Sequence, residues 1–223
     1  MIDTDVTFIN EEFHAHRVSP AQMDELLAIG WRHFGTQFFR YNFGFYDLDI
    51  RRVIPLRIRL SKFSPSKSQR RVLRRNADLE TVVRPVEITE EAEKLFHRHK
   101  RRFTHGVPDS IYDFLSREPA ACPIEAEEFA VFDDGRLIAV SYFDIGGISI
   151  SGTYAMFDPS ETGRGLGIFT MLKEIEFSID AGKDFYYQGY AYEGNSFYDY
   201  KKRFRGSEAF DWNRGWETLG NLQ

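Results

Sequence analysis

The chain has 223 residues, of which 42% are hydrophobic and 28% are charged, and its formal net charge is -5. This composition excludes an intrinsically disordered protein, because the chain has enough apolar side chains to bury a core. The single cysteine, Cys122, excludes a disulfide-stabilised scaffold and suits a reducing compartment. No apolar run approaches the roughly 20 residues of a membrane-spanning helix, and the acidic start is unlike a secretory signal. We therefore expect a cytoplasmic protein that does not enter the membrane.

Basic residues are concentrated in one part of the chain. Residues 51–102 contain 16 Lys and Arg against six Asp and Glu, whereas the remainder contains 13 basic and 28 acidic residues. Residues 51–77 hold ten basic side chains and no acidic one. Such clustering is typical of a surface that binds a polyanion, because neutralised phosphates release their condensed counterions. The alternative is a solvated basic face that pairs with the acidic remainder of the chain.

The first half of the chain is predicted to alternate short helices and strands. Ser19 and Pro20 are a good N-cap and first turn for a helix that Gly30 ends. Residues 53–60 alternate apolar and mainly basic positions, which predicts a half-exposed strand with a basic polar face. The other elements expected here are a strand over 36–46, a helix over 67–76, a strand over 81–86, a helix over 89–103 and a short helix after Asp109.

The second half is predicted to begin with an antiparallel meander. Strands are expected over 128–132, 137–145 and 148–157, with an Asp-Gly turn before the second. A turn containing Gly163, Gly165 and Gly167 follows, and then an amphipathic helix that Gly182 ends. The remaining elements expected are a strand over 185–192, a short helix over 196–204 and a strand over 208–212.

This order of elements resembles an acetyltransferase-like (GNAT) core. The fold class expected is therefore α+β, with a mixed, mostly antiparallel sheet, flanking helices and a smaller N-terminal α/β part. We place that part at residues 1–80 and the core at residues 81–223. Backbone amides at the glycine turn (residues 162–167) could hold a pyrophosphate or another acyl carrier, although three glycines also suit a merely tight connection.

Several stretches, read together, resemble one enzyme family. The strongest is the block FSPSKSQRRVLRRN at residues 63–76, which lies inside the acid-free basic run. The other similar stretches are GWRHFGTQFFR at 30–40, LFHRH at 95–99, YAMFDP at 154–159, residues 160–173, YYQGY at 186–190 and YDYKKRF at 198–204. They are similar to segments of the arginyl-tRNA and leucyl-tRNA protein transferases of the N-degron pathway. The resemblance spans most of the chain from Gly30 onward.

The sequence also departs from this family's pattern. The family usually has an N-terminal cysteine cluster before and around the stretch that here covers residues 41–55, where no cysteine occurs. Iron–sulfur, haem or zinc regulation through such a cluster is therefore not expected. Tyr198 stands where the family has Met, and Arg205 and Gly206 follow Phe204 in place of its Pro.

The resemblance implies transfer of arginine or leucine from charged tRNA to the N-terminal α-amine of acceptor proteins that begin with Asp or Glu, which marks them for degradation. It implies no cofactor other than the aminoacyl-tRNA co-substrate. Because the tRNA ester is already activated, holding a neutral amine beside it supplies much of the rate. The amine must also lose a proton and the oxyanion must be stabilised. Because an α-amino group has a pKa of roughly 8, a neutral fraction is available without a strong base.

Candidate site residues follow from this chemistry and from the residue types present. For orientation, proton handling and the oxyanion, the candidates are Tyr187, Gly189, Tyr190 and Tyr200. For tRNA they are Lys67, Ser68, Gln69, Arg70, Arg71, Arg74, Arg75 and Asn76, with the cations on one helix face and Gln69 or Asn76 reading the terminal nucleotide. For the acidic acceptor residue they are Arg32, Arg40, His97, Arg98 and Lys201.

Two further functions remain open at this point. An acyl-CoA-dependent N-acyltransferase would use the glycine turn but leaves the basic block unexplained. A tRNA-binding relative without activity would fit the departures from the family's pattern. No metal site is expected, because His97 and His99 do not share a helix face and Cys122 lacks a neighbouring base.

Overall fold

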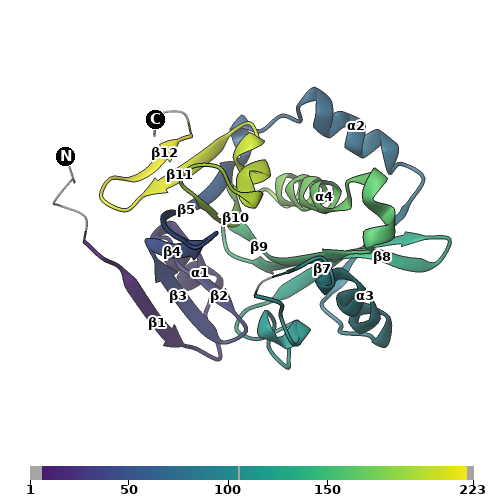
Figure 1. Cartoon of the computed structure of the whole chain (residues 1–223), viewed down its shortest axis with the longest axis horizontal. Helices are drawn as coiled ribbons and strands as arrows, with labels where there is room; N and C mark the ends of the chain where they lie inside the picture. Colours follow the sequence, from purple (N-terminus) through teal and green to yellow (C-terminus); the bar gives the residue numbers. More distant parts are fainter. Residues whose placement is uncertain (1–6, 105, 220–223) are drawn as a thin grey trace.

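A computed structural model describes residues 7–104 and 106–219, and Figure 1 shows the arrangement of its elements. A nine-stranded sheet forms the centre, with strand order β12-β11-β5-β10-β9-β8-β7-β6 and with β4 paired to β5. All pairs in it are antiparallel except β9 with β10. Its strands are β4 (Phe43–Tyr46), β5 (Asp49–Arg59), β6 (Glu80–Pro85), β7 (Ala126–Asp133), β8 (Arg136–Ile145), β9 (Ser149–Phe157), β10 (Phe185–Tyr192), β11 (Ser207–Asp211) and β12 (Gly215–Thr218).

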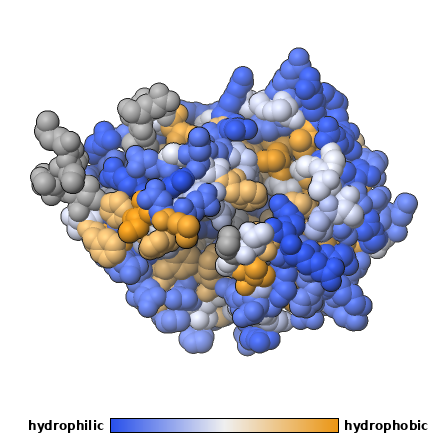
Figure 2. All heavy atoms as spheres, viewed as in Figure 1, coloured by the Kyte–Doolittle hydropathy of each residue, from blue (hydrophilic) through white to orange (hydrophobic). Residues whose placement is uncertain are grey.

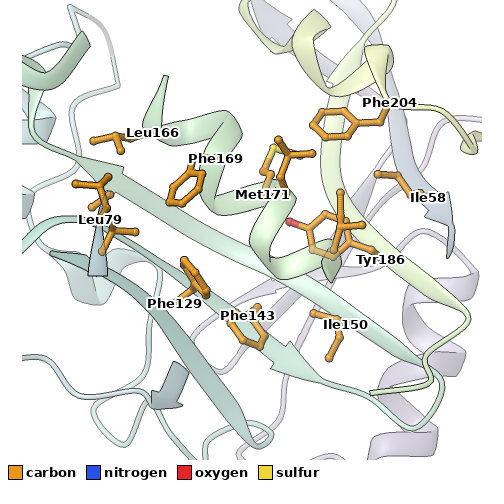
Figure 3. Packing of buried hydrophobic residues seen from close by; sticks show 14 of the residues in the cluster. Ile58, Leu79, Phe129, Phe143, Ile150, Leu166, Phe169, Met171, Tyr186 and Phe204 are labelled. Carbon is orange, nitrogen blue, oxygen red and sulfur yellow. The ribbon is translucent and has the colours of Figure 1, made fainter. Parts of the chain in front are cut away.

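Two helices cover opposite faces of this sheet. Successive side chains of a strand point to opposite faces, and the burial of β7 follows this rule. Phe129 and Val131 pack in the core cluster with α4 (Leu166–Asp180), whereas Ala130 packs in the cluster with α3 (Glu90–Lys100). Figure 3 shows the first cluster, in which Phe169 of α4 packs near Phe129 of β7, and Met171 of α4 lies on the side of Phe204.

A smaller unit from the start of the chain lies beside the large sheet. Its three strands, in the order β1-β3-β2, are β1 (Asn10–His14), β2 (Arg32–Phe34) and β3 (Gln37–Tyr41). Helix α1 (Pro20–Ala28) begins at the expected cap, because Ser19 accepts a hydrogen bond from the Gln22 amide. Met23 and Leu27 of α1 pack with Phe38 and Tyr187, so this unit is attached to β10 through a shared apolar cluster.

Strand β5 lies inside the large sheet, between β10 and β11, and is largely buried. The expectation of a half-exposed strand with a basic outer face is therefore wrong. Arg57 is only 7% exposed, because its guanidinium donates to Glu208 Oε2 at 2.8 Å, and Arg59 donates to Glu208 Oε1 at 2.7 Å. The parts expected at residues 1–80 and 81–223 thus share one sheet, and that division of the chain stays a prediction.

The remaining helical segments connect these elements and agree with the expected order. The helix expected over residues 67–76 is α2 (Lys67–Arg75), with Ser66 as its N-cap and Asn76 as its C-cap. The short 3-10 segments are η1 (Leu60–Lys62), η2 (Ile111–Asp113), η3 (Pro159–Arg164) and η4 (Phe197–Arg203). None of the helices in the described ranges combines the length and apolar character that crossing a membrane requires.

Candidate functional site

The two parallel strands of the sheet separate at its centre. Strands β9 and β10 pair only where residues 149–151 meet residues 185–187. Immediately beyond, the register of β10 against β5 shifts between Tyr187 and Gly189, which marks a bulge at Gln188. Within the described residues, β9 forms no further pair on this side. An opening therefore lies between Gly152 on β9 and the bulge on β10.

Arg32 of β2 reaches into this opening. Its Nη1 donates to Ser151 Oγ at 2.7 Å, and its Nη2 donates to the carbonyl of Gly152. The guanidinium thus donates to a β9 carbonyl that has no partner from β10, because β10 has turned away at this point. Arg32 is 9% exposed, and burial lowers its pKa, while the charge of Asp144 acts in the opposite direction.

A second cation faces the same bulge. Lys201 of η4 donates from Nζ to the carbonyl of Tyr190 at 3.3 Å and lies 5.2 Å from the centre of the Tyr198 ring. A side chain at position 189 would begin 3.4 Å from Lys201 Nζ and 3.8 Å from Arg32 Nη2. Gly189 has φ +86° and therefore suits both the backbone conformation and the close approach of the cations.

These two cations have no carboxylate within ion-pair distance among the described residues. Asp144 contributes charge near Arg32, but its Oδ2 contacts His33 and Thr153 at 2.9 Å each. Lys201 receives no such compensation: burial lowers its pKa to about 7, and the charge of Arg32 lowers it as well. Two like charges held together in a shielded place favour the binding of an anion.

A buried carboxyl group lies on the α4 side of the opening. Glu174 accepts a hydrogen bond from the hydroxyl of Tyr186, and burial raises the pKa of Glu174 to about 7. A side chain at Gly152 would begin 2.8 Å from that hydroxyl and 3.1 Å from Glu174 Oε2. The glycine therefore lets β9 approach these groups. Across the described ranges, no three His, Cys, Asp or Glu side chains come together as a metal site.

The expected catalytic tyrosines differ in what their hydroxyl groups contact. Tyr190 donates to the carbonyl of Gly30 at 2.6 Å, and Tyr187 accepts from Arg57 at 3.3 Å. Both hydroxyls thus serve the packing of the N-terminal unit and of β5, which argues against their expected role in proton handling. Tyr200 has no side-chain hydrogen bond within the described part of the chain, and burial raises its pKa to about 12. Of the three, Tyr200 has the hydroxyl that is free to contact a substrate.

Two residues of the site were not among the sequence candidates. Gln188 is 5% exposed at the bulge, where its Nε2 donates to the carbonyl of Lys201 at 3.1 Å while its Oε1 has no partner among the described residues. Arg102 follows α3, and its guanidinium lies over the ring of Phe157 at 4.3 Å. Its charge opposes the rise in the pKa of Tyr200 that burial causes. A bulge cannot be recognised from one sequence, so no local signal pointed to Gln188.

Three expected acceptor-binding residues lie away from this pair of cations. Arg40 donates from Nε to Glu11 and from Nη1 to the carbonyl of Ile29. Arg98 pairs with Asp158 at 3.1 Å, and His97 is exposed on α3. The structure therefore brings Arg32 and Lys201 together but leaves these three outside the pair.

The basic helix α2 presents its cations to solvent as expected. Lys67, Ser68, Arg70, Arg71, Arg74 and Arg75 are exposed, whereas Val72 and Leu73 pack against the core. The surface over α2, at the upper right of Figure 2, is mostly hydrophilic. No carboxylate of the described residues pairs with a cation of this helix. The alternative of a basic face neutralised by acidic residues thus does not describe α2.

The two amide side chains of this block have structural partners. Gln69 is 5% exposed, and its Oε1 accepts from the Ser66 amide at 2.8 Å as part of the helix cap. Asn76 is 1% exposed, and its Nδ2 donates to the carbonyls of Val72 at 2.9 Å and Arg164 at 3.0 Å. The expectation that either amide reads a nucleotide is therefore not supported, because both side chains are buried and hold α2 in place.

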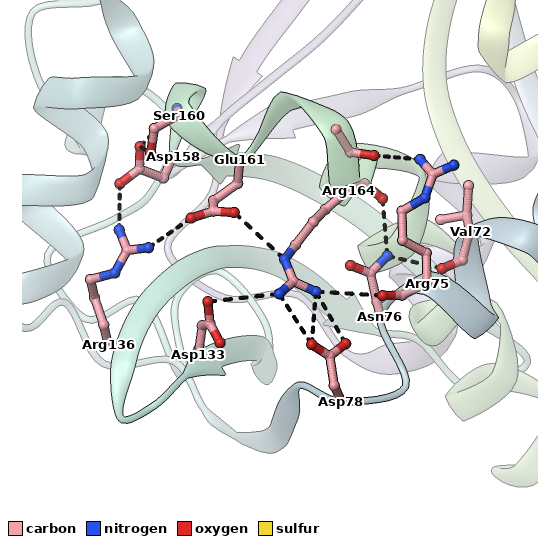
Figure 4. Close-up of polar contacts among 11 residues, drawn as sticks. Val72, Arg75, Asn76, Asp78, Asp133, Arg136, Asp158, Ser160, Glu161 and Arg164 are labelled. Atoms are coloured by element: carbon pink, nitrogen blue, oxygen red, sulfur yellow. Dashed lines mark hydrogen bonds and ion pairs between the residues drawn. The ribbon is translucent and has the colours of Figure 1, made fainter.

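The glycine turn supports α2. Figure 4 shows Arg75 and Asn76 donating to the carbonyls of Gly163 and Arg164, while the Arg164 side chain pairs with Asp78 at 3.1 Å. Val72 also lies 3.7 Å from where a side chain at Gly165 would begin. Helix α2 thus covers the turn, which favours the tight connection over an open cradle for an acyl carrier.

Comparison with solved structures agrees with the fold derived above. FemX aligns with 84% of this chain and 65% of its own, with a TM-score of 0.52 and 12% sequence identity. That likeness shows the fold alone. The mixed, mostly antiparallel sheet with flanking helices, opened between two parallel strands, is the GNAT-like fold. The fold class expected from the sequence is confirmed.

Comparison of the sequence identifies the family. Residues 4–71 match the model of the arginine-tRNA-protein transferase N terminus, and residues 91–211 match the model of its C terminus. An aspartate/glutamate leucyltransferase of Xanthomonas campestris pv. campestris (strain B100) is 34% identical over 181 residues, which cover 78% of this chain and 71% of the relative. One of Stenotrophomonas maltophilia (strain K279a) is 31% identical over 185 residues, covering 75% and 70%. The chain belongs to the arginine-tRNA-protein transferase family and is an aminoacyltransferase.

The structural role of Asn76 can be tested directly. We predict that Asn76→Ala lowers the free energy of unfolding by about 1–3 kcal/mol, because two partly buried backbone carbonyls lose their donor. Urea denaturation measures this change, and Ala77→Ser at the exposed next position is the control. A variant with unchanged stability but weakened tRNA binding would contradict this role and favour contact with a nucleotide.

Proposed function

We propose that this enzyme transfers leucine from charged tRNA to the N-terminal α-amine of acceptor proteins that begin with Asp or Glu. The donor and acceptor follow the names of the relatives, which are aspartate/glutamate leucyltransferases. We place the reaction in the cytoplasm, where charged tRNA is available, and its product is a protein marked for degradation. The aminoacyl-tRNA is a substrate, so the reaction needs no further activated group.

The observation that carries this proposal is the cation pair Arg32 and Lys201. Both groups approach Gly189, and neither has a carboxylate partner within the described residues. The side chain of an N-terminal Asp or Glu supplies the missing charge. It would interact with two shielded cations, where charge-assisted hydrogen bonds are stronger than at the surface. A neutral N-terminal residue would leave Lys201 without a compensating charge.

The same binding mode places the α-amine beside the opening between β9 and β10. The amine nitrogen attacks the ester carbonyl, the new amide bond forms and the ester bond to the ribose breaks. The amine loses one proton, and the ribose oxygen that leaves gains one. Gln188 Oε1 lacks a donor among the described residues and suits the amine, while the free hydroxyl of Tyr200 and the Gly189 amide are the donors we assign to the oxyanion.

Helix α2 supplies the tRNA-binding surface in this proposal. Its exposed cations face solvent without carboxylate partners, and the glycine turn fixes the end of the helix. Phosphates of the acceptor stem would displace counterions from these side chains. An acyltransferase that uses acyl-CoA would not require this basic surface.

A transfer assay tests the donor and the acceptor together. Labelled Leu-tRNA and Arg-tRNA are each offered with peptides that begin with Asp, Glu or Ala. We expect label from Leu-tRNA on the Asp and Glu peptides, and we expect its loss when Arg70, Arg71, Arg74 and Arg75 are replaced by Ala. Label from Arg-tRNA alone would overturn the choice of donor. Salt-sensitive tRNA binding without any transfer would instead indicate a binding protein.

The acceptor preference is predicted to depend on pH through Lys201. The pKa of this amine is lowered to about 7, so its charged fraction falls as the pH rises through 7. The ratio of kcat/KM for an Asp peptide to that for the matched Asn peptide should therefore fall at least about fivefold between pH 6.5 and 8.5. The Asn peptide corrects for titration of the α-amine itself.

Lys201→Arg provides the decisive comparison, because a guanidinium keeps its charge over this range. The ratio should fall clearly less in this variant, and the fall that remains is assigned to Glu174 at the opening, whose pKa is also raised to about 7. Lys202→Arg is the matched control, since Lys202 pairs with Asp199 at 2.8 Å on the same short helix. A ratio that falls equally in all three proteins would show that Lys201 does not read the acceptor's charge.

A further inference from the structure

A second group of exposed cations lies between η4 and the start of α2. Arg205 donates from Nη1 to Ser64 Oγ at 3.2 Å, and Arg70 donates from Nη1 to the carbonyl of Pro65 at 2.6 Å. Two guanidiniums from distant parts of the sequence therefore contact neighbouring residues. Two further exposed cations lie nearby in the sequence: Arg203 at the end of η4 and Lys62 at the end of η1.

Close packing fixes these segments against each other. The rings of Phe63 and Phe204 stack with centres 6.5 Å apart, and the Arg59 amide donates to the carbonyl of Gly206 at 2.9 Å. Gly206 has φ +79°, and a side chain there would begin 2.9 Å from the carbonyl oxygen of Arg59. The glycine after Arg205 thus permits the contact that joins the two segments.

No carboxylate of the described residues pairs with Lys62, Arg203 or Arg205. Other cations of the chain do have such partners. Lys202 pairs with Asp199, and Arg214 pairs with Asp211 and Glu217. The group is therefore uncompensated and continues the uncompensated surface of α2, and together they form one positively charged area.

The position of this group relates it to the transfer site. Segment η4 carries Lys201, which faces the bulge at Gly189, and Arg203 two residues later. The carbonyl of Lys201 accepts from Gln188, which fixes η4 to the bulge, and Phe204 at the end of η4 packs against Phe63 after η1. The cations of Arg203 and Arg205 therefore lie beside the path that a single strand of nucleic acid would take from α2 to the transfer site.

We propose that Lys62, Arg203 and Arg205 bind the phosphates of the unpaired 3′ end of the charged tRNA, between the acceptor stem on α2 and the ester at Gly189. This inference rests on the proposed function. Single-stranded nucleic acid brings a closely spaced row of phosphates, which suits cations that have no partner of their own. Arg205 is one of the two residues that stand in place of the family's Pro after Phe204, and in this proposal it contacts the donor tRNA.

The test is binding of leucyl-tRNA by the full chain in which Arg203→Ala and Arg205→Ala are combined. Intact tRNA and tRNA lacking its four unpaired 3′ nucleotides are compared by filter binding across a range of salt concentrations. We expect affinity for intact tRNA to fall about tenfold near 0.1 M salt, with a salt slope lower by about 1.4, the value for two single-strand contacts. The shortened tRNA should bind the variant and the unchanged protein equally.

The matched control combines Arg117→Ala with Arg214→Ala, which removes two exposed arginines from other elements. Equal binding of intact tRNA by the test variant and this control would overturn the inference, as would an equal loss for both tRNAs. If the quadruple variant of α2 also binds like the unchanged protein, the proposed function fails instead. The pair Arg203→Gln and Arg205→Gln repeats the test with longer side chains if the Ala variant does not fold.

Discussion

The separation of β9 from β10 is the constraint on which the rest of the site depends. Once the strands part beyond Ser151, the backbone of β9 needs a new partner, and Arg32 from the N-terminal unit supplies it. The N-terminal unit is therefore required to complete the centre of the large sheet. The same guanidinium, placed for a structural reason, becomes half of the charge that an acidic substrate would meet.

Two kinds of positive charge serve different purposes in this account. Arg32 and Lys201 are shielded, so a single carboxylate can be distinguished from a neutral group of similar shape. The cations of α2 are exposed and numerous, which suits a long polyanion bound through many weak contacts. Arg57 and Arg59 belong to neither group, because both pair with Glu208 within the sheet.

Much of the fold could be predicted because its signals are local. Ser66 and Gln69 cap α2, and the Asp-Gly turn joins β7 to β8, so both elements could be located from neighbouring residues. The burial of β5 could not be predicted, since its partner Glu208 lies about 150 residues further along the chain. For the same reason, Asn76 was expected to face a nucleotide, although it binds the carbonyl of Arg164. Arg32 and Lys201 were found through the resemblance, whereas the bulge at Gln188 depends on the register of three strands.

The most direct test of the central claim is a crystal structure of the enzyme with a short peptide that begins with Asp. The Asp carboxylate should lie within about 2.7–3.2 Å of Lys201 Nζ and of the Arg32 guanidinium. The α-amine should then point into the opening between β9 and β10. A carboxylate bound at His97 and Arg98 on α3, with the pair at Gly189 unoccupied, would contradict the account.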